Sequence, residues 1–152
     1  MQIRRASPDD HPSLAQVMFR AIHDGDSPYT PAQRNAWCPT PPQGNGWQAR
    51  LAAQHVFMAE DSTPLGFMTL RDDGYLDLAY ILPEARGNGL FRRLYTRIED
   101  TARSLGLSKI ETHASLSAQA PFAAVGFTLI QHEIVTRADQ TLPRAQMRKN
   151  LS

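Results

Sequence analysis

The most informative segment of the chain covers residues 79–95 and reads Ala-Tyr-Ile-Leu-Pro-Glu-Ala-Arg-Gly-Asn-Gly-Leu-Phe-Arg-Arg-Leu-Tyr. It predicts an apolar strand, a short turn that contains Arg86, Gly87 and Gly89, and an amphipathic helix directly afterwards. The first N–H groups of a helix have no partner within it, and the helix dipole places about half a positive charge there. Glycines let an anion approach this backbone, and Arg86 adds a formal charge. The stretch therefore predicts a phosphate or pyrophosphate site.

Two common phosphate-binding motifs do not fit this loop. A Walker loop needs a glycine, a spacer and then Gly-Lys-Ser or Gly-Lys-Thr, and no such run exists. A dinucleotide-binding loop needs a further Gly or Ala after Gly87 and Gly89, and that position is Arg92. A tight turn without a ligand is the alternative interpretation of the same residues, so the rest of the chain has to decide between them.

The composition is typical of a soluble globular protein with one domain. The chain has 152 residues, of which 41% are hydrophobic and 20% charged. The net charge of +1 and the scattered arginines give no argument for nucleic acid or an anionic membrane as a partner. No apolar run is long enough to span a membrane, and the first residues lack the core of a signal peptide. Cys38 is the only cysteine, so we expect a cytoplasmic protein without disulfides or a metal.

Hydrophobic periodicity and turn residues divide the chain into helices and strands. Ser7-Pro8 and Thr30-Pro31 are helix starts, and the region from residue 55 to 82 has the short turns of an antiparallel meander. In order, we expect a strand over 2–6, helices after Ser7, after Thr30 and over 47–54, strands over 55–60, 65–71 and 75–82, a helix from the glycine loop to 105, a strand over 108–114, a short helix over 118–125, and strands over 127–137 and about 146–151.

This order of elements and two local motifs match one family. In the loop, Arg86, Gly89 and Phe91 fall on the three defined positions of the pattern Gln/Arg-x-x-Gly-x-Gly/Ala. Downstream, residues 115–127 follow the frame Asn-x-x-Ala-x-x-x-Tyr-x-x-x-Gly-Phe. The sequence therefore resembles the GNAT N-acetyltransferase superfamily, and residues 29–37 resemble a subgroup of small bacterial members.

The sequence departs from the family pattern at three positions. Phe91 stands where a small residue is expected, Ser115 replaces the Asn, and Phe122 replaces the Tyr, while Ala118 keeps the register. The resemblance implies an α/β (α+β) fold with residues 1–152 as a single domain. It also implies a mixed, mostly antiparallel sheet of about six to seven strands flanked by about four to five helices, with splayed parallel strands at its centre.

The resemblance further implies acetyl-CoA as co-substrate and transfer of its acetyl group to a primary amine of a small molecule or peptide by direct attack. Freed backbone groups near Ile81 and Leu82 would pair with the pantetheine amides, and an N–H near Ile81 would polarise the thioester carbonyl. The amides of residues 86–91 would hold the pyrophosphate. The residues implied in cofactor binding are Ile81, Leu82, Arg86, Gly87, Asn88, Gly89, Leu90, Phe91, Ser115 and Ala118.

Acetyl transfer needs a base for the ammonium proton, since a lysine-type amine has a pKa of about 10.4, and an acid for the leaving thiolate. Candidates for the base are Asp77 on the central strand, and Glu111 and His113 on its neighbour. A structural role is the alternative for each of them. Phe122 cannot donate a proton, so the acid stays unassigned. Besides solvent, its candidates are the hydroxyls of Tyr80, Tyr29 and Ser115.

The segment between the first two strands is expected to bind the acceptor. Aspartates beside aromatic rings would suit a cationic amine. A solvated loop anchored by its tryptophans is the alternative. The residues concerned are His23, Asp24, Asp26, Tyr29, Gln33, Trp37 and Trp47. We expect neither nucleic acid nor a membrane as a partner, and a homodimer is left open.

Two further functions compete with acetyl transfer. A CoA-binding sensor or partner protein that has lost catalysis would account for the departures at Phe91 and Phe122. A serine hydrolase would use Ser115, His113 and Asp77, but the chain has no Gly-x-Ser-x-Gly elbow.

Overall fold

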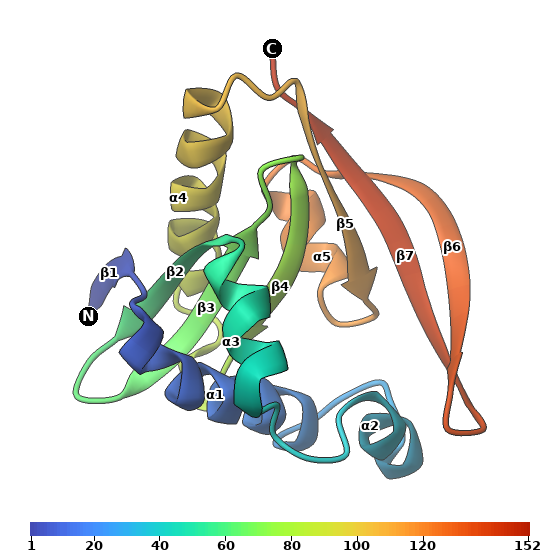
Figure 1. Ribbon diagram of the computed structural model, residues 1–152. Helices are drawn as coiled ribbons and strands as arrows, with labels where there is room; N and C mark the ends of the chain where they lie inside the picture. The colour runs from blue at the N-terminus through green and yellow to red at the C-terminus, as the bar shows by residue number, and fades with distance from the viewer.

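The computed structural model describes residues 1–152 and contains one seven-stranded sheet with helices on both faces (Figure 1). The strands are β1 (Gln2–Arg5), β2 (His55–Glu60), β3 (Pro64–Leu70), β4 (Tyr75–Ile81), β5 (Lys109–Ser115), β6 (Thr128–Arg137) and β7 (Gln140–Asn150). The helices are α1 (His11–His23), α2 (Pro31–Trp37), α3 (Gly44–Ala52), α4 (Leu90–Ser104) and α5 (Gln119–Ala124), with 3₁₀ turns η1 (Pro8–Asp10) and η2 (Pro83–Ala85). The strand order is β1-β2-β3-β4-β5-β7-β6, and only β4 and β5 are parallel neighbours. The predicted fold class is confirmed.

Some predicted boundaries were wrong, most clearly that of the last strand, which begins at Gln140 rather than near residue 146. Pro143 breaks the strand pattern in the sequence, because proline cannot donate to a sheet ladder. In the structure its carbonyl accepts a hydrogen bond from the Tyr29 hydroxyl, beyond the end of β5. The side of Pro143 that lacks an N–H therefore faces away from β6, and the strand continues through it. The first helix also opens with the 3₁₀ turn η1, and α3 begins before the predicted residue 47.

The two faces of the sheet bury separate cores, because side chains alternate along each strand. In β2, Phe57 packs into the core under α4 and α5, whereas Val56 and Met58 pack against α1 and α3. The amphipathic α4 turns Leu94 and Ile98 onto the sheet, and both are fully buried. Figure 1 shows α4 and α5 on one side of the sheet and α1 and α3 on the other.

The parallel strands β4 and β5 separate after a short contact. They pair only at Tyr75 with Glu111 and at Leu76 with Thr112. The Thr112 hydroxyl donates to the Leu76 carbonyl at 2.9 Å and holds the closed end together. Beyond this point the strands diverge (Figure 1), so the facing edges carry backbone groups without a neighbouring strand. The predicted splayed strands are present.

A β-bulge in β4 sets the direction of the residues that follow it. Asp77 and Leu78 together stand opposite the single residue Thr69 of β3, whose hydroxyl accepts the Leu78 N–H at 3.1 Å. The bulge reverses the alternation of side chains along the strand. Leu76 packs into the α4 core, whereas Leu78 and Tyr80 pack on the α1 side.

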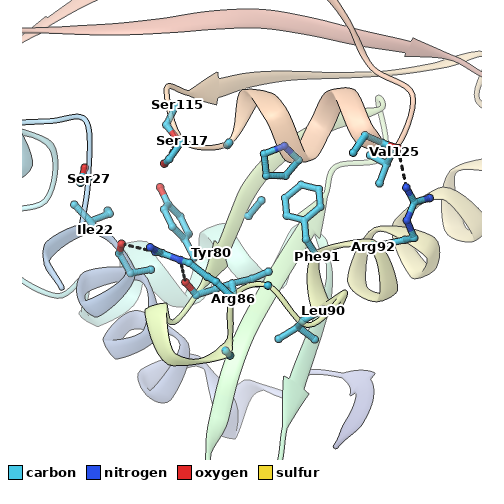
Figure 2. A pocket seen from close by; sticks show the side chains of 18 of the residues that line it. Ile22, Ser27, Tyr80, Arg86, Leu90, Phe91, Arg92, Ser115, Ser117 and Val125 are labelled. Atoms are coloured by element: carbon cyan, nitrogen blue, oxygen red, sulfur yellow. Dashed lines mark hydrogen bonds between the residues drawn. The ribbon is translucent and has the colours of Figure 1, made fainter. Parts of the chain in front are cut away.

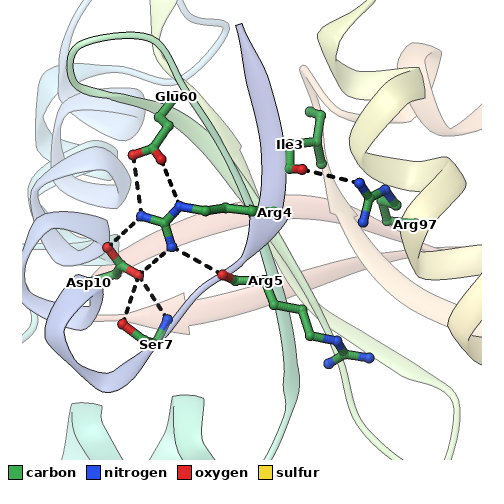
Figure 3. Close-up of polar contacts among 7 residues, drawn as sticks. All are labelled: Ile3, Arg4, Arg5, Ser7, Asp10, Glu60 and Arg97. Atoms are coloured by element: carbon green, nitrogen blue, oxygen red, sulfur yellow. Dashed lines mark hydrogen bonds and ion pairs between the residues drawn. The ribbon is translucent and has the colours of Figure 1, made fainter.

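The first strand is tied to the helical layer by one arginine (Figure 3). Arg4 donates to Glu60 at 2.7 Å and to both carboxylate oxygens of Asp10 at 2.8 and 2.9 Å. Asp10 in turn accepts the Ser7 N–H at 2.8 Å. The hydrogen bonds from Arg4 hold the pKa of Asp10 well below its usual range. Arg4 thus joins β1, β2 and the start of α1.

Candidate active site

A cavity of about 370 Å³ lies where β4 and β5 diverge, beside the glycine loop (Figure 2). Its walls come from the end of α1, the second half of β4, the start of α4 and the turn from β5 into α5. More than half of its lining residues are hydrophobic, and none is a carboxylate. The residues that line it are Ala21, Ile22, Ser27, Tyr29, Trp37, Ala79, Tyr80, Ile81, Ala85, Arg86, Gly87, Gly89, Leu90, Phe91, Arg92, Ser115, Ser117, Ala118, Pro121, Ala124 and Val125.

The glycine loop borders this cavity and holds a row of backbone N–H groups that have no acceptor within the chain. Gly87 and Gly89 have φ angles of +83° and +75°, a left-handed conformation that favours glycine. From Gly87 to Arg92 no backbone N–H donates to an acceptor within the chain. The amide of Arg86 differs, because it donates to the Pro83 carbonyl at 3.3 Å. The six free amides at the head of α4 form a cradle suited to an anion with several oxygens.

The Arg86 side chain lies beside this cradle and joins α1 to β4. Its guanidinium donates to the Ile81 carbonyl and to the Ala21 carbonyl, both at 3.0 Å (Figure 2). Burial lowers the pKa of Arg86, while the nearby Glu84 acts in the opposite direction. No carboxylate forms an ion pair with Arg86. Its charge is therefore available to an anion that enters the cavity.

The edge of β4 offers a free N–H at Ile81 rather than at Leu82. The N–H of Leu82 donates to the Leu65 carbonyl at 2.9 Å, on the β3 side. Because backbone direction alternates along a strand, the polar groups of Ile81 point the opposite way, as its bond from Arg86 also indicates. The Leu82 side chain is buried in the α1 core and does not line the cavity. Of the two predicted residues, Ile81 alone faces the opening.

The two phenylalanines that depart from the family pattern contact each other. Phe91 and Phe122 pack edge to face with their ring centroids 5.0 Å apart. Phe122 also packs on Phe127 at 5.0 Å and is only 2% exposed. Phe91 lines the cavity from its place against Phe122, while the adjoining amides stay unpaired. Its bulk is therefore part of the wall and not of the cradle.

Tyr80 is the hydroxyl that points into the cavity from β4. Figure 2 shows its ring between Arg86 and the two serines, with its oxygen toward Ser115 and Ser117. No carbonyl or carboxylate of the chain accepts a hydrogen bond from this hydroxyl. Burial raises the pKa of Tyr80, so the hydroxyl keeps its proton at neutral pH. Its position results from the bulge in β4, which turns it away from the α4 core.

Asp77 lies outside the cavity. Its carboxylate accepts hydrogen bonds from Arg50 at 2.9 and 3.0 Å and from Gln54 at 2.8 Å. Although burial acts to raise the pKa of Asp77, the bonds from Arg50 and Gln54 lower it below its usual range. A carboxylate so engaged is an ion-pair partner that fastens α3 to β4. The structure does not bring it to the acetyl group's expected position.

His113 and Glu111 also lie outside the cavity. The Nδ1 of His113 is 2.6 Å from the Tyr75 hydroxyl, and its Nε2 is 3.3 Å from Glu133 Oε1. Burial opposes ionisation of Glu111, but its contacts with basic neighbours, one of them Arg148 at 3.2 Å, lower its pKa. The hydroxyl of the predicted hydrolase serine, at position 115, approaches another serine hydroxyl at 3.4 Å, not His113. No hydrolase triad is assembled.

The family is decided by comparison with known sequences. The sequence model described as the acetyltransferase (GNAT) domain matches residues 27–151. The chain belongs to the GNAT acetyltransferase family. The predicted membership of this family is thereby confirmed.

Solved structures share the GNAT fold with this chain. A GCN5-related N-acetyltransferase from Rhodopseudomonas palustris is 25% identical, with a TM-score of 0.88 over 99% of this chain and 95% of that one. A phosphinothricin acetyltransferase from Sinorhizobium meliloti, in complex with acetyl-CoA, is 20% identical with a TM-score of 0.73 over 99% and 88% of the two chains. PaiA N-acetyltransferase from Thermoplasma acidophilum, in complex with coenzyme A, is 17% identical with a TM-score of 0.71 over 99% and 98%. The last two are similar to this GNAT protein in fold alone.

Of the residues expected to bind the acceptor, only Tyr29 and Trp37 line the cavity. Tyr29 accepts the Leu116 N–H at 3.0 Å and donates to a β7 carbonyl, and burial raises its pKa. The others hold the local structure or face solvent. Three of them donate to backbone carbonyls: His23 to Cys38 at 2.6 Å, Gln33 to Thr141 at 2.8 Å and Trp47 to His11 at 2.7 Å. Asp24 pairs with Arg20 at 3.2 Å, and Asp26 is exposed. The expected acidic, cation-binding wall is therefore absent from this cavity.

Several lining residues had no signal in the sequence. Ser27 and Ser117 are loop serines without a motif, and Arg92 is one of two adjacent arginines on α4. Arg92 donates to the Ala124 carbonyl at 2.8 Å and so joins α4 to α5 (Figure 2). Asn88, by contrast, was predicted for its place in the loop, and it contributes its free amide but does not line the cavity.

The GNAT protein shows no group of three or more His, Cys, Asp or Glu side chains that could hold a metal ion. None of its helices has the length and apolar character needed to cross a membrane.

Proposed function

We propose that this protein transfers an acetyl group from acetyl-CoA to a primary amine of a small molecule or peptide, by direct attack in a ternary complex. The observation that carries the proposal is the row of six unpaired amides, Gly87 to Arg92, at the mouth of a cavity between two diverging parallel strands. Backbone donors at a helix start favour a diphosphate, and diverging strands leave room for an extended chain beside it. The acetyl-CoA and CoA bound to relatives of the same fold support this assignment.

In this proposal the cofactor follows the β4 edge. Its pyrophosphate lies on the amides of the glycine loop, with the Arg86 charge alongside. Its pantetheine arm passes between Ile81 and the turn of Ser115 and Ala118, which line the opposite wall. The free N–H of Ile81 then points to the side where the thioester carbonyl would lie, and it would stabilise the oxyanion of the tetrahedral intermediate.

The acceptor amine must lose its proton before it attacks. The cavity holds no carboxylate and is bordered by Arg86 and Arg92, so an ammonium ion is disfavoured inside it. Entry into the cavity therefore lowers the pKa of the amine and releases the proton to water. His113 borders an adjoining hollow that shares Tyr29 and Ser115 with the cavity, and we assign it as the group that receives this proton through water.

The Tyr80 hydroxyl is our candidate for the acid. The amine nitrogen attacks the thioester carbonyl carbon, and the nitrogen of the tetrahedral intermediate gives up its extra proton to water. The C–S bond then breaks to release the amide, and the thiolate of CoA takes the proton of Tyr80. Solvent then returns a proton to Tyr80. The support for this role is geometric, because Tyr80 lies in the cavity wall with its hydroxyl toward Ser115 and Ser117.

The test is thiol release from acetyl-CoA across a panel of primary amines, with equilibrium CoA binding measured in parallel. Turnover of at least one amine, with N-acetylated product seen by mass spectrometry, would support the proposal. One observation favours a second candidate, a CoA-binding sensor. The ring of Phe122 is buried and carries no hydroxyl, so the residue at the family's usual acid position cannot donate a proton. CoA binding and heat stabilisation without turnover of any amine would favour the sensor.

A further inference from the structure

A smaller hollow of about 70 Å³ adjoins the main cavity and shares three of its lining residues, Tyr29, Trp37 and Ser115. The rest of its wall comes from strands β5, β6 and β7. Those residues are His113, Val135, Arg137, Leu142 and Arg144. The hollow therefore lies at the aromatic end of the cavity, where the proposed acceptor would enter, and not at the glycine loop.

Strand register brings the two arginines to this place. Arg144 of β7 stands opposite Ser115 of β5 on one side and opposite Glu133 of β6 on the other. Residues two apart along a strand share a face, so Arg137 of β6 lies on the face of Glu133. Helix α2 lies on this side of the sheet, because its Trp37 lines the hollow together with Arg137 and Arg144. No local sequence pattern joins these residues, because they come from three strands.

The positive charges of Arg137 and Arg144 are largely unpaired within the chain. Arg137 is exposed and makes no hydrogen bond or ion pair within the chain. Arg144 approaches one carboxylate oxygen, Glu133 Oε1, with its Nε at 3.4 Å, and none of its guanidinium nitrogens donates a hydrogen bond within the chain. The same oxygen, Glu133 Oε1, also lies 3.3 Å from His113 Nε2, so His113 and Arg144 share one carboxylate. No carboxylate lines the hollow itself. A cationic acceptor would meet like charges here.

We propose that the acceptor amine carries an anionic group, a carboxylate or a phosphate, which Arg144 and Arg137 bind in the hollow while the amine reaches the thioester in the main cavity. This inference rests on the proposed acetyl transfer. Guanidinium groups with free terminal nitrogens bind carboxylates and phosphates through paired, charge-assisted hydrogen bonds. Tyr29 and Trp37 lie between the two spaces and would pack on the apolar part of the acceptor. In the sequence, Asp24 and Asp26 suggested an acidic surface that binds a cationic acceptor, whereas here two basic side chains bind an anionic group of the acceptor.

The experiment compares matched acceptors in the acetyl-CoA assay. L-phenylalanine is set against L-phenylalaninamide and phenethylamine, and O-phosphoethanolamine against ethanolamine, so that a carboxylate and a phosphate are tested separately. The variants are Arg144→Gln, Arg144→Lys and Arg137→Gln. The control is Arg148→Gln, because Arg148 lies on the same strand, pairs with Glu111 at 3.2 Å and lines neither space. Thermal unfolding shows whether each variant folds, and Arg137→Gln removes a side chain that has no partner to lose.

We expect the wild type to prefer an anionic member of at least one pair. Removal of either arginine should reduce kcat/KM for that acceptor about 10- to 100-fold, mainly through KM, with partial rescue by Arg144→Lys and no loss in Arg148→Gln. Equal or better turnover of the neutral members, or a preference that survives both Arg144→Gln and Arg137→Gln, would overturn the inference and leave acetyl transfer in place. Failure of every amine, with CoA still bound, would overturn the proposed function and this inference together.

Discussion

Substitution of Gly89 by glutamate tests the anion cradle most directly. Gly89 precedes the first turn of α4 with a φ of +75°, and a Cβ added there would meet no atom within 4 Å. The side chain of Gly89→Glu therefore projects into open space at the cradle instead of clashing with the fold. Two separate effects follow, a conformational one on stability and an electrostatic one on the ligand.

The magnitudes of the two effects differ. An L-residue in the left-handed region costs about 1–2 kcal/mol of folding free energy, which corresponds to about 2–8 °C in Tm for a chain of this length. A glutamate charge about 5 Å from a phosphate charge, at an effective dielectric constant of about 20, repels it by about 3 kcal/mol. That is about a 200-fold increase in Kd for CoA. The protein should therefore stay folded and lose the cofactor.

Isothermal titration with CoA and thermal unfolding measure the two effects. The matched control is Gly44→Glu, because Gly44 begins α3 with a φ of +79°, has no atom within 4 Å of an added Cβ, and lies outside the cavity. It should lose similar stability and keep wild-type affinity for CoA. Gly89→Ala separates strain from charge and should bind CoA more tightly than Gly89→Glu. Wild-type affinity in Gly89→Glu, or equal loss in Gly44→Glu, would refute the assignment of the cradle.

Three further predictions concern catalysis and stability. Tyr80→Phe should lower kcat about 100-fold without changing the Kd for CoA, which steady-state kinetics and CoA titration measure. An unchanged kcat would show that Tyr80 is not the acid. Asp77→Asn should lower the free energy of unfolding by about 1 kcal/mol at pH 7, because the bond with Arg50 lowers the pKa of Asp77 in the folded state. This stabilisation is present above the unfolded pKa of about 3.9 and is lost as the pH falls. The free energies of unfolding of the two proteins, measured in urea, should therefore converge in acid. Arg4→Gln should destabilise the fold by about 1 kcal/mol at pH 7. Its deficit should also shrink in acid, because Arg4 lowers the pKa of Asp10, and a deficit that is constant with pH would contradict this account.

The sequence predicted the conformation of the glycine loop better than the positions of the candidate bases, and particular residues show why. Gly87 and Gly89 were recognisable because a helix start and a left-handed turn are local features, formed by residues adjacent in the chain. Asp77 was one candidate for the base because it lies on the central strand. The bulge at Asp77 and Leu78, and the approach of Arg50 from α3, depend on segments distant in sequence, and they place its carboxylate elsewhere.

Phe91 and Phe122 also show a relation between residues that the sequence alone does not reveal. In the sequence, Phe91 and Phe122 are separate departures from a family pattern, and each weakens a match. In the fold they are one contact, with ring centroids 5.0 Å apart, and Phe91 turns toward that contact instead of into the cradle. A pair of residues on different helices cannot be recognised as a pair until the helices are placed.

The order of helices and strands, the glycine turn before α4 and the resemblance to the GNAT family can be read from the sequence, because periodicity, caps and glycine conformations are set by neighbouring residues. Which side chains share the cavity depends on the tertiary structure. The divergence of β4 from β5, the bulge that turns Tyr80 inward and the register that gathers Arg137 and Arg144 all arise from pairing between distant strands. A shift of one residue in such a pairing moves a side chain to the other face of the sheet, so the chemistry of the site depends on contacts that no local pattern contains.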